Sequence, residues 1–293
     1  MNDQIDLLAF WGHHRAGTTW ISDVIRQVCL DMGLNFAYVH NSRMFKFDLK
    51  EFINREKIEF LAYTNADFEY VKQLENFIGF HVIRDPRDIV VSAYFSHLYS
   101  HSTDEWSELV EHRNKLEKLS KDDGLMLEME FRRKEFEMMY NWDYSLPNIQ
   151  EIKFEELAHN PYRIFLETFQ FLGILDDSRP RFKTRFSFLI SMYINNRLQY
   201  RNNRLHRKSI GYKPFRVPIR KIPVERLLGI VYENDFSKKA GGRKPGEEDV
   251  KSHYRKGIAG DWRNQFNEEH KKSFKGHFNK LVVKLGYETN DKW

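Results

Sequence analysis

The residues whose types and spacing first point to chemistry lie in the segment WGHHRAGTTW, residues 11–20. Gly12 and Gly17 have the Gly-x-x-x-x-Gly spacing of a phosphate loop, in which backbone N–H groups at the start of a helix bind an anion. A nucleotide triphosphatase would have Lys directly after the second glycine, but Thr18 occupies this position. The cation is instead Arg15, inside the loop. The segment therefore predicts a site for a phosphate or sulfate group.

Such a loop needs a strand before it and a helix after it. Residues 5–11, which are apolar except for Asp6, predict the strand. Apolar residues at helical spacing from Ile21 to Met32 predict a helix that Gly33 ends. Further strands are predicted at residues 35–40, 58–63, 77–83 and 149–154, of which residues 77–83 are nearly continuous in apolar residues. Strands that alternate with helices predict an α/β fold, a single domain over residues 1–293 with a mainly parallel sheet flanked by helices.

A second strand-to-helix transition lies in HVIRDPRDIVVSAYFSH, residues 81–97. Asp85 can cap the helix, Pro86 suits its first position and Asp88 follows three residues after the cap, so we expect a helix to begin where the strand ends. Charged helices with apolar faces are predicted near residues 104–119 and 125–140, and another helix from Asn160 to Gly173.

Composition limits the class of protein. The chain has 293 residues, 41% of them hydrophobic, and its single cysteine, Cys29, cannot form an internal disulfide or a multi-thiol zinc site. The start of the chain has neither a basic signal-type region nor an apolar run near the ~18 residues of a membrane span. We therefore expect a cytoplasmic protein that is not anchored, with Cys29 in its core and without a bound metal.

Positive charge is concentrated in one segment. The net charge is only +5, yet residues 178–224 contain thirteen Lys or Arg and no Asp or Glu. Residues 185–200 are apolar at helical spacing, so the segment could be a substrate lid, a contact with an anionic membrane, or a helix packed on the sheet. The glycine-rich residues 237–250 predict a flexible loop. A nucleic-acid partner is not expected, because no nucleic-acid-binding motif accompanies the charge.

Residues 15–20, Arg-Ala-Gly-Thr-Thr-Trp, resemble the 5'-phosphosulfate loop of sulfotransferases that use 3'-phosphoadenosine 5'-phosphosulfate (PAPS), with Arg where Lys is usual. Residues 83–97 resemble the 3'-phosphate segment of the same family, with Arg84 and Ser92 on its two binding positions. The stretch RKGIAGDWRNQF, residues 255–266, is similar to the family's C-terminal motif. These three matches occur in the family's order and span nearly the whole chain.

The resemblance implies a sulfotransferase of the bacterial-like small-molecule branch, with a P-loop-kinase-like sulfotransferase fold. It implies transfer of a sulfuryl group from PAPS to a hydroxyl or amine of a small organic acceptor, with release of PAP and without a metal. Arg15 would stabilise charge on the leaving phosphate, and Trp20 and Phe236 would stack on adenine. The implied cofactor-binding residues are Arg15, Ala16, Gly17, Thr18, Thr19, Trp20, Arg84, Ser92, Phe154, Phe236, Arg255, Lys256 and Gly257.

The general base departs from the family pattern. Where cytosolic members have Lys-Thr-His, this chain has Tyr63-Thr64-Asn65, and an amide cannot act as a base at neutral pH. Other branches have their base at the end of the second strand, and His40 lies near this point, which makes it the first candidate. Asp67 is the second candidate and His14 the third.

Two other functions remain open from the sequence: a catalytically inactive PAP- or PAPS-binding protein, and a P-loop kinase. The loop cation at Arg15 and the missing Thr-His turn motivate the first, whereas the missing Lys weighs against the second. The family's C-terminal dimer motif is broken at Asn267, Glu268 and Lys272, so we predict no dimer from it.

Overall fold

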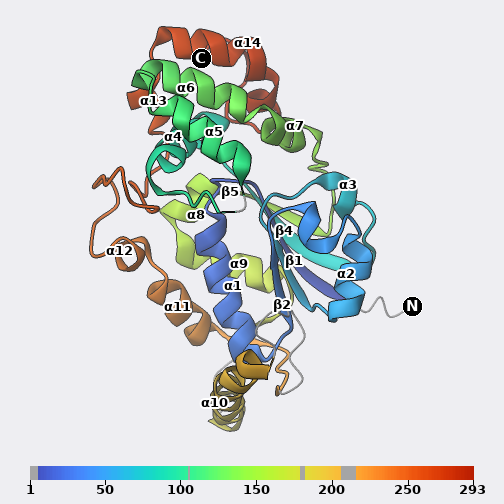
Figure 1. Cartoon of the computed structure of the whole chain (residues 1–293). Helices are drawn as coiled ribbons and strands as arrows, with labels where there is room; N and C mark the ends of the chain where they lie inside the picture. Colours follow the sequence, from blue (N-terminus) through green and yellow to red (C-terminus); the bar gives the residue numbers. More distant parts are fainter. Residues whose placement is uncertain (1–5, 105, 179–181, 206–215) are drawn as a thin grey trace. The chain divides into compact units, whose positions relative to one another are not determined.

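The computed structural model describes residues 6–104, 106–178, 182–205 and 216–293 (Figure 1). The chain divides into two compact units. Unit 1 consists of Met1–His13, Gly17–Val82 and Asp143–Asn234, and unit 2 of His14–Ala16, Ile83–Trp142 and Asp235–Trp293. Because these segments alternate along the chain, no single cut separates the units. The single domain over residues 1–293 stays a prediction.

The central sheet has five strands in the order β2-β3-β1-β4-β5. The strands are β1 (Leu7–Gly12), β2 (Phe36–Val39), β3 (Phe60–Tyr63), β4 (Phe77–Ile83) and β5 (Ile149–Lys153). β2 pairs with β3, β3 with β1, and β1 with β4, all in parallel. β1, β2, β3 and β4 are nearly continuous in apolar residues, as expected for parallel strands that are covered on both faces, whereas the edge strand β5 also contains Gln150, Glu151 and Lys153. The predicted α/β class with a parallel sheet is confirmed.

The helices of unit 1 surround this sheet (Figure 1). They are α1 (Thr18–Met32), α2 (Leu49–Glu56), α3 (Phe68–Val71), α8 (Phe154–His159), α9 (Pro161–Phe171), α10 (Phe182–Leu205) and α11 (Val224–Glu233), with the 3-10 turn η1 (Ser42–Phe45). Two short strands, β6 (Leu175–Asp176) and β7 (Ile222–Pro223), pair in parallel. α1 packs against both α10 and α11, and α11 packs against α9.

α1 begins and ends at glycines in the left-handed conformation, Gly17 with φ 76° and Gly33 with φ 67°. Its apolar face, including Val24, Ile25 and Val28, lies in the core of unit 1, and Cys29 is buried there as predicted. The helical spacing in the sequence therefore identified the buried face correctly.

Unit 2 contains the remaining helices. They are α4 (Pro86–Phe95), the π turn η2 (Ser96–Ser100), α5 (Ser107–Leu116), α6 (Lys121–Phe131), α7 (Arg133–Asn141), α12 (Phe236–Lys239), α13 (Trp262–Gln265) and α14 (Glu268–Lys284). α4 begins as predicted, because the Asp85 side chain accepts a hydrogen bond from the Arg87 N–H and Pro86 occupies the first turn. The single helix predicted at residues 125–140 is wrong: α6 ends at Phe131 and α7 begins at Arg133, with the buried Arg132 between them.

The motif after Arg84 holds unit 2 together. The Arg87 guanidinium pairs with Asp85 and Glu288, and it lies over the rings of Trp262, at 4.0 Å, and Trp293, at 4.4 Å. Two C-terminal backbone N–H groups, those of Gly260 and Trp262, donate to the Asp88 carboxylate. The stretch predicted as a flexible loop is hydrogen-bonded to the C-terminal motif, from the Gly246 and Asp249 N–H groups to residues 255 and 256. None of the helices in the described part of the chain is long and apolar enough to span a membrane.

Candidate functional site

The loop after β1 has a backbone that favours glycine at one position and is strained at another. A Cβ on Gly17 would lie 2.5 Å from the Phe154 ring, and φ is +76° there, so only glycine fits. Arg15 has φ 66°, a conformation that costs a non-glycine residue about 1–2 kcal/mol. Lys46, Phe47, Lys57 and Asn76 also have positive φ, so the strain does not single out Arg15, and its role stays a prediction.

Arg15 belongs to unit 2, where two other predicted residues contact it. Its Nε donates to Ser92 Oγ at 3.0 Å, and its carbonyl oxygen accepts from Arg84 Nη1 at 2.9 Å. Thus the loop motif and the segment at residues 83–97, which were identified separately in the sequence, meet in this unit. The assignment of Arg84 and Ser92 to a 3'-phosphate stays a prediction.

Positive charge is crowded around Arg15. Burial, and then the positive charges of three other arginines, lower the pKa of Arg15 to about 9. These arginines are Arg84, Arg255 and Arg132, whereas Glu128 acts in the opposite direction. Arg15 is still protonated at neutral pH, so unit 2 holds a buried group of cations whose mutual repulsion a bound anion would relieve.

Arg255 and Lys256 have acidic partners. Both side chains pair with Asp261, at 2.6 Å and 2.7 Å, and Arg255 also pairs with Glu248. Burial alone would raise the pKa of Asp261, but its hydrogen bonds to Lys256 and Arg255 lower it to about 2. A phosphate at these two cations would have to compete with Asp261, which distinguishes them from Arg15. Next to them, a Cβ on Gly257 would lie 2.5 Å from the Phe236 ring.

Of the other residues predicted to bind the cofactor, Gly17, Thr18, Thr19 and Trp20 lie at the start of α1 and Phe154 begins α8, all in unit 1, whereas Ala16 is buried in unit 2. Gly17, which has no side chain, caps the helix, and Thr18 and Thr19 follow it, so the first N–H groups of the helix can bind an anion. Trp20 packs edge-on against Phe165, with ring centroids 5.7 Å apart. Its adenine contact, like that of Phe236, stays a prediction.

The first two base candidates lie at the carboxyl edge of the sheet. Val39, Tyr63 and Trp11 are aligned across β2, β3 and β1, so the chain leaves all three strands at one edge. His40, directly after β2, is exposed, and its backbone N–H donates to Met44 Sδ at 3.4 Å. β2 is two strands from β1, or about 10 Å. Asp67 caps α3 by accepting the Glu69 N–H at 3.0 Å, which is a structural use of its carboxylate.

His14, the third base candidate, belongs to unit 2 and contacts Arg132. Arg132 Nη1 donates to His14 Nδ1 at 2.9 Å. The ring stacks on His97 with centroids 5.4 Å apart and meets Trp106 edge-on. Burial, and then Arg132, lower the pKa of His14 well below its ordinary value, so its imidazole is neutral at neutral pH.

Arg132 is held by the buried carboxylate of Glu128. Glu128 Oε1 lies 3.1 Å from Arg132 Nε and 3.0 Å from His97 Nδ1, and Oε2 lies 2.7 Å from His112 Nε2. Burial alone would raise the pKa of Glu128, but its histidine and arginine partners lower it to about 2. The side chains of His97, His112 and Glu128 are close enough to ligate a metal ion. The guanidinium already provides a cation at this carboxylate, so these contacts form an ion-pair network.

A second buried network, in unit 1, contains His13. His81 Nδ1 lies 2.7 Å from Glu151 Oε2, and His81 Nε2 lies 2.8 Å from His13 Nε2. Burial lowers the pKa of His81 to about 3 and also lowers the pKa of His13, so both rings are neutral. Neither network was predicted from the sequence, because each loop histidine is paired with a residue 68 or 118 positions away.

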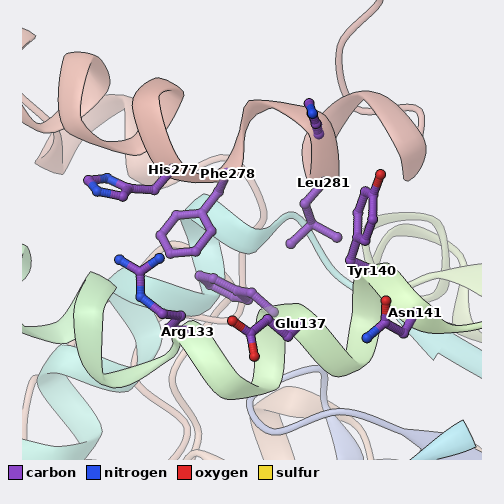
Figure 2. Close-up of a pocket in the computed structure, with 9 residues that line it drawn as sticks. Arg133, Glu137, Tyr140, Asn141, His277, Phe278 and Leu281 are labelled. Atoms are coloured by element: carbon purple, nitrogen blue, oxygen red, sulfur yellow. The ribbon is translucent and has the colours of Figure 1, made fainter.

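A pocket of about 200 Å³ lies between α7 and α14 in unit 2. Figure 2 shows Phe278 and Leu281 of α14 pointing toward α7. Its lining residues are Arg133, Phe136, Glu137, Tyr140, Asn141, His277, Phe278, Lys280 and Leu281. This set shares no residue with the predicted nucleotide site, so the pocket adds nothing to that prediction.

The basic segment is described in part. Residues 206–215 lie outside the described residues, whereas α10 packs on α1 through Phe188 and through Asn195, which bonds to the Asp31 carbonyl. On its other face, α10 exposes large apolar side chains at helical spacing: Phe186, Leu189, Ile190 and Tyr193. One face of α10 therefore packs against the helix α1, and the other face presents apolar surface; the roles of the segment as a lid or a membrane contact stay predictions.

Comparisons with known proteins agree with this fold. No family model matches the chain, and no curated protein matches its sequence. Among solved structures, mouse sulfotransferase SULT7A1 in complex with PAP is similar over 96% of this chain and 87% of its own, with a TM-score of 0.50 and 16% identity. Retinol dehydratase in complex with androsterone and PAP is similar over 95% and 81%, with a TM-score of 0.48 and 13% identity. The chain therefore has the fold of PAPS-dependent sulfotransferases, as its sequence motifs predicted.

Proposed function

We propose that the chain is a sulfotransferase that moves the sulfuryl group of PAPS to a hydroxyl or amine of a small organic acceptor and releases PAP. The observation that carries this proposal is that Arg15 contacts both Ser92 and Arg84, so two basic side chains from the two motifs meet where an anionic ligand would be favoured. The sulfotransferase fold and the three motifs support the choice of PAPS as that ligand. PAP is also the ligand in the SULT7A1 structure.

Different residues would bind the 5'-phosphosulfate and the 3'-phosphate of PAPS. Arg15, with the Thr18 and Thr19 hydroxyls, would hold the 5'-phosphosulfate at the start of α1. Arg84 and Ser92 would hold the 3'-phosphate, together with Arg255, Lys256 and Gly257, all in unit 2. Because Arg255 and Lys256 already pair with Asp261, we expect Arg15 to contribute more of the binding energy than these two residues.

In the reaction, the acceptor oxygen or nitrogen forms a bond to sulfur while the bond from sulfur to the bridging phosphate oxygen breaks, and that oxygen keeps the electron pair. Arg15 stabilises the negative charge that develops on this phosphate. The acceptor proton passes to a base, for which we propose His40, with Asp67 as the second candidate, both at the carboxyl edge of the sheet. In His40→Ala, we expect loss of transfer with PAP binding retained, and full activity would exclude His40.

The proposal is tested by binding. PAP at 100 times its Kd should raise the free energy of unfolding by about 2.7 kcal/mol, and Arg15→Ala should remove most of that gain. Arg163→Ala is a matched control, because Arg163 is exposed and paired with Glu167 on α9. Stabilisation by ATP with magnesium but not by PAP would favour the kinase and contradict our proposal. Binding of PAP without turnover of PAPS on a panel of alcohols, phenols and amines would favour the inactive binding protein.

We also propose that the exposed face of α10 contacts an anionic membrane. The observation in its favour is the apolar stripe from Phe186 to Tyr193 within a segment whose charged residues are all basic. Co-sedimentation with phosphatidylserine vesicles should exceed that with phosphatidylcholine vesicles and should fall in Leu189→Ser and Ile190→Ser. Val110→Ser, at an exposed apolar position of α5, should leave binding unchanged. If none of these variants lowers binding, α10 is not the contact.

A further inference from the structure

The contact between Arg132 and His14 fixes which nitrogen of the His14 ring has the proton. A guanidinium has only donors, so in the 2.9 Å contact Arg132 Nη1 donates and His14 Nδ1 accepts. A neutral imidazole with an accepting Nδ1 has its proton on Nε2. The other nitrogen of His14 is therefore a hydrogen-bond donor, and it has no lone pair with which to take a proton from an acceptor.

The surroundings of Arg132 keep this tautomer in place. The side chain is buried, its Nε lies 3.1 Å from Glu128, and its Nη1 lies 3.3 Å from Glu135. The guanidinium also lies over the Phe131 ring at 4.7 Å. Because these contacts fix the guanidinium and ring stacking fixes the imidazole, rotation of either group would break several interactions at once.

The positive charges around His14 favour a neutral ring that donates a hydrogen bond. Arg15 follows it directly in the chain, and Arg15 and Arg132 both disfavour a positive charge on the ring. An imidazolium here would add to the cations around Arg15, whereas a neutral ring offers an N–H without adding charge. This is the arrangement by which a neutral histidine stabilises developing negative charge as an electrophile.

We propose that His14 is a catalytic hydrogen-bond donor whose Nε2–H contacts the anion held by Arg15, and that Arg132 is the positioning residue that fixes its tautomer. The identity of the anion rests on the proposed function, but the tautomer does not. His14 then stabilises the same phosphate oxygens as Arg15, and the base role that the sequence suggested for it is excluded while the Arg132 contact persists.

Three variants of His14 separate a donor from a base. The probe is the rate of PAP release from PAPS with 2-naphthol as acceptor. A Gln side chain can place an N–H near the position of Nε2 but cannot act as a base, whereas the shorter Asn places its amide near Nδ1. We expect His14→Ala and His14→Asn to lower kcat by about 100-fold or more, and His14→Gln to remain within about 10-fold of wild type. Equal loss in all three variants would overturn the proposal.

A second measurement does not depend on turnover. In the full-length protein labelled with 15N-histidine, with and without PAP, His14 should show a protonated Nε2 and an unprotonated Nδ1 near pH 7.5. Arg132→Lys retains a donor and should keep this tautomer, whereas Arg132→Met should shift the population toward a protonated Nδ1. A protonated Nδ1 or an imidazolium in the wild-type protein would overturn the inference, whereas failure to bind PAP would contradict the proposed function and leave this result unaffected.

Discussion

His13 and His14 are adjacent in one loop, but their hydrogen-bond partners give the two rings opposite tautomers. His13, in unit 1, contacts His81, which contacts the carboxylate of Glu151. Because a carboxylate accepts, His81 Nδ1 donates to it, His81 Nε2 accepts, and His13 Nε2 is the donor. The remaining nitrogen of His13, Nδ1, is then an acceptor. In His14, the guanidinium of Arg132 reverses this order, so that the remaining nitrogen is a donor.

The role that one nitrogen of a histidine can play therefore depends on what the other nitrogen contacts, and not on the place of the residue in a motif. Both rings are buried enough that their pKa values fall, so both stay neutral and each keeps one tautomer. Where the chain of contacts ends at a carboxylate, as for His13, the remaining ring nitrogen is an acceptor. Where it ends at an arginine, as for His14, the remaining ring nitrogen is a donor. The two networks also differ in the burial of their carboxylates. The side chain of Glu128 is fully buried, whereas that of Glu151 is partly exposed.

The largest expected effect is that of breaking the network of His14 at Glu128. Glu128→Gln removes the charge that compensates the buried Arg132, so we expect a loss of about 3–5 kcal/mol in the free energy of unfolding. Urea denaturation followed by circular dichroism measures it. Glu130→Gln, the same change on α6, is the control: Glu130 is exposed and pairs with Arg133 at 2.6 Å, so its loss should stay below about 1 kcal/mol. Equal losses would show that Glu128 does not hold Arg132 as a buried charge.

The sequence predicted the parts of the molecule that local signals determine. The spacing of Gly12 and Gly17 located the loop, and the Asp85 cap with Pro86 located the start of α4. The motifs also identified Arg15 and Arg84, which the structure brings into contact. In each case the signal lies within a few residues of the feature that it predicts.

The networks behind the loop could not be predicted, because their partners are brought together only by tertiary packing. Glu128 and Arg132 lie in a stretch that reads as one amphipathic helix, and nothing local shows that the helix breaks so that Arg132 can be buried. His81 is a polar position in the apolar strand β4, and Glu151 lies in β5, where polar and apolar residues are mixed, so the pairing of the two side chains is ambiguous until the sheet order is known.

The second largest expected effect is a loss of stability at acidic pH, which we expect from both networks. Burial lowers the pKa of His97 to about 4 and that of His81 to about 3, so the unfolded chain takes up protons first as the pH falls below 6.5. The stability that each neutral ring contributes is complete above pH 6.5 and is lost as the pH falls toward its folded-state pKa. When the pH falls from 7 to 5, each ring should lower the free energy of unfolding by about 2 kcal/mol.

Variants without the titrating ring measure this contribution in each unit. His97→Gln in unit 2 and His81→Gln in unit 1 should each reduce the loss of stability between pH 7 and pH 5 by about 2 kcal/mol, whatever their stability at pH 7. His159→Gln, at an exposed position of α8, is the matched control for the substitution itself. If neither buried variant changes the pH dependence, burial does not lower the pKa values of His97 and His81 in the folded protein, and the loss of stability in acid has another cause.

The smallest effect tests the direction of the hydrogen bonds in unit 1. Glu151→Gln keeps an oxygen that can accept from His81 Nδ1 at a partly exposed position, so we expect it to lower the unfolding free energy by less than about 1 kcal/mol. Glu151→Leu leaves the buried His81 N–H without this acceptor and should cost about 1–3 kcal/mol. Both are measured by urea denaturation at pH 7.5. If Glu151→Gln lowers the unfolding free energy as much as Glu151→Leu does, His81 needs the negative charge of Glu151 and not merely an acceptor. The His81 ring is then an imidazolium, and its Nε2–H donates to His13 Nε2. In that case His13 has its proton on Nδ1, and this nitrogen is a donor, as the remaining nitrogen of His14 is.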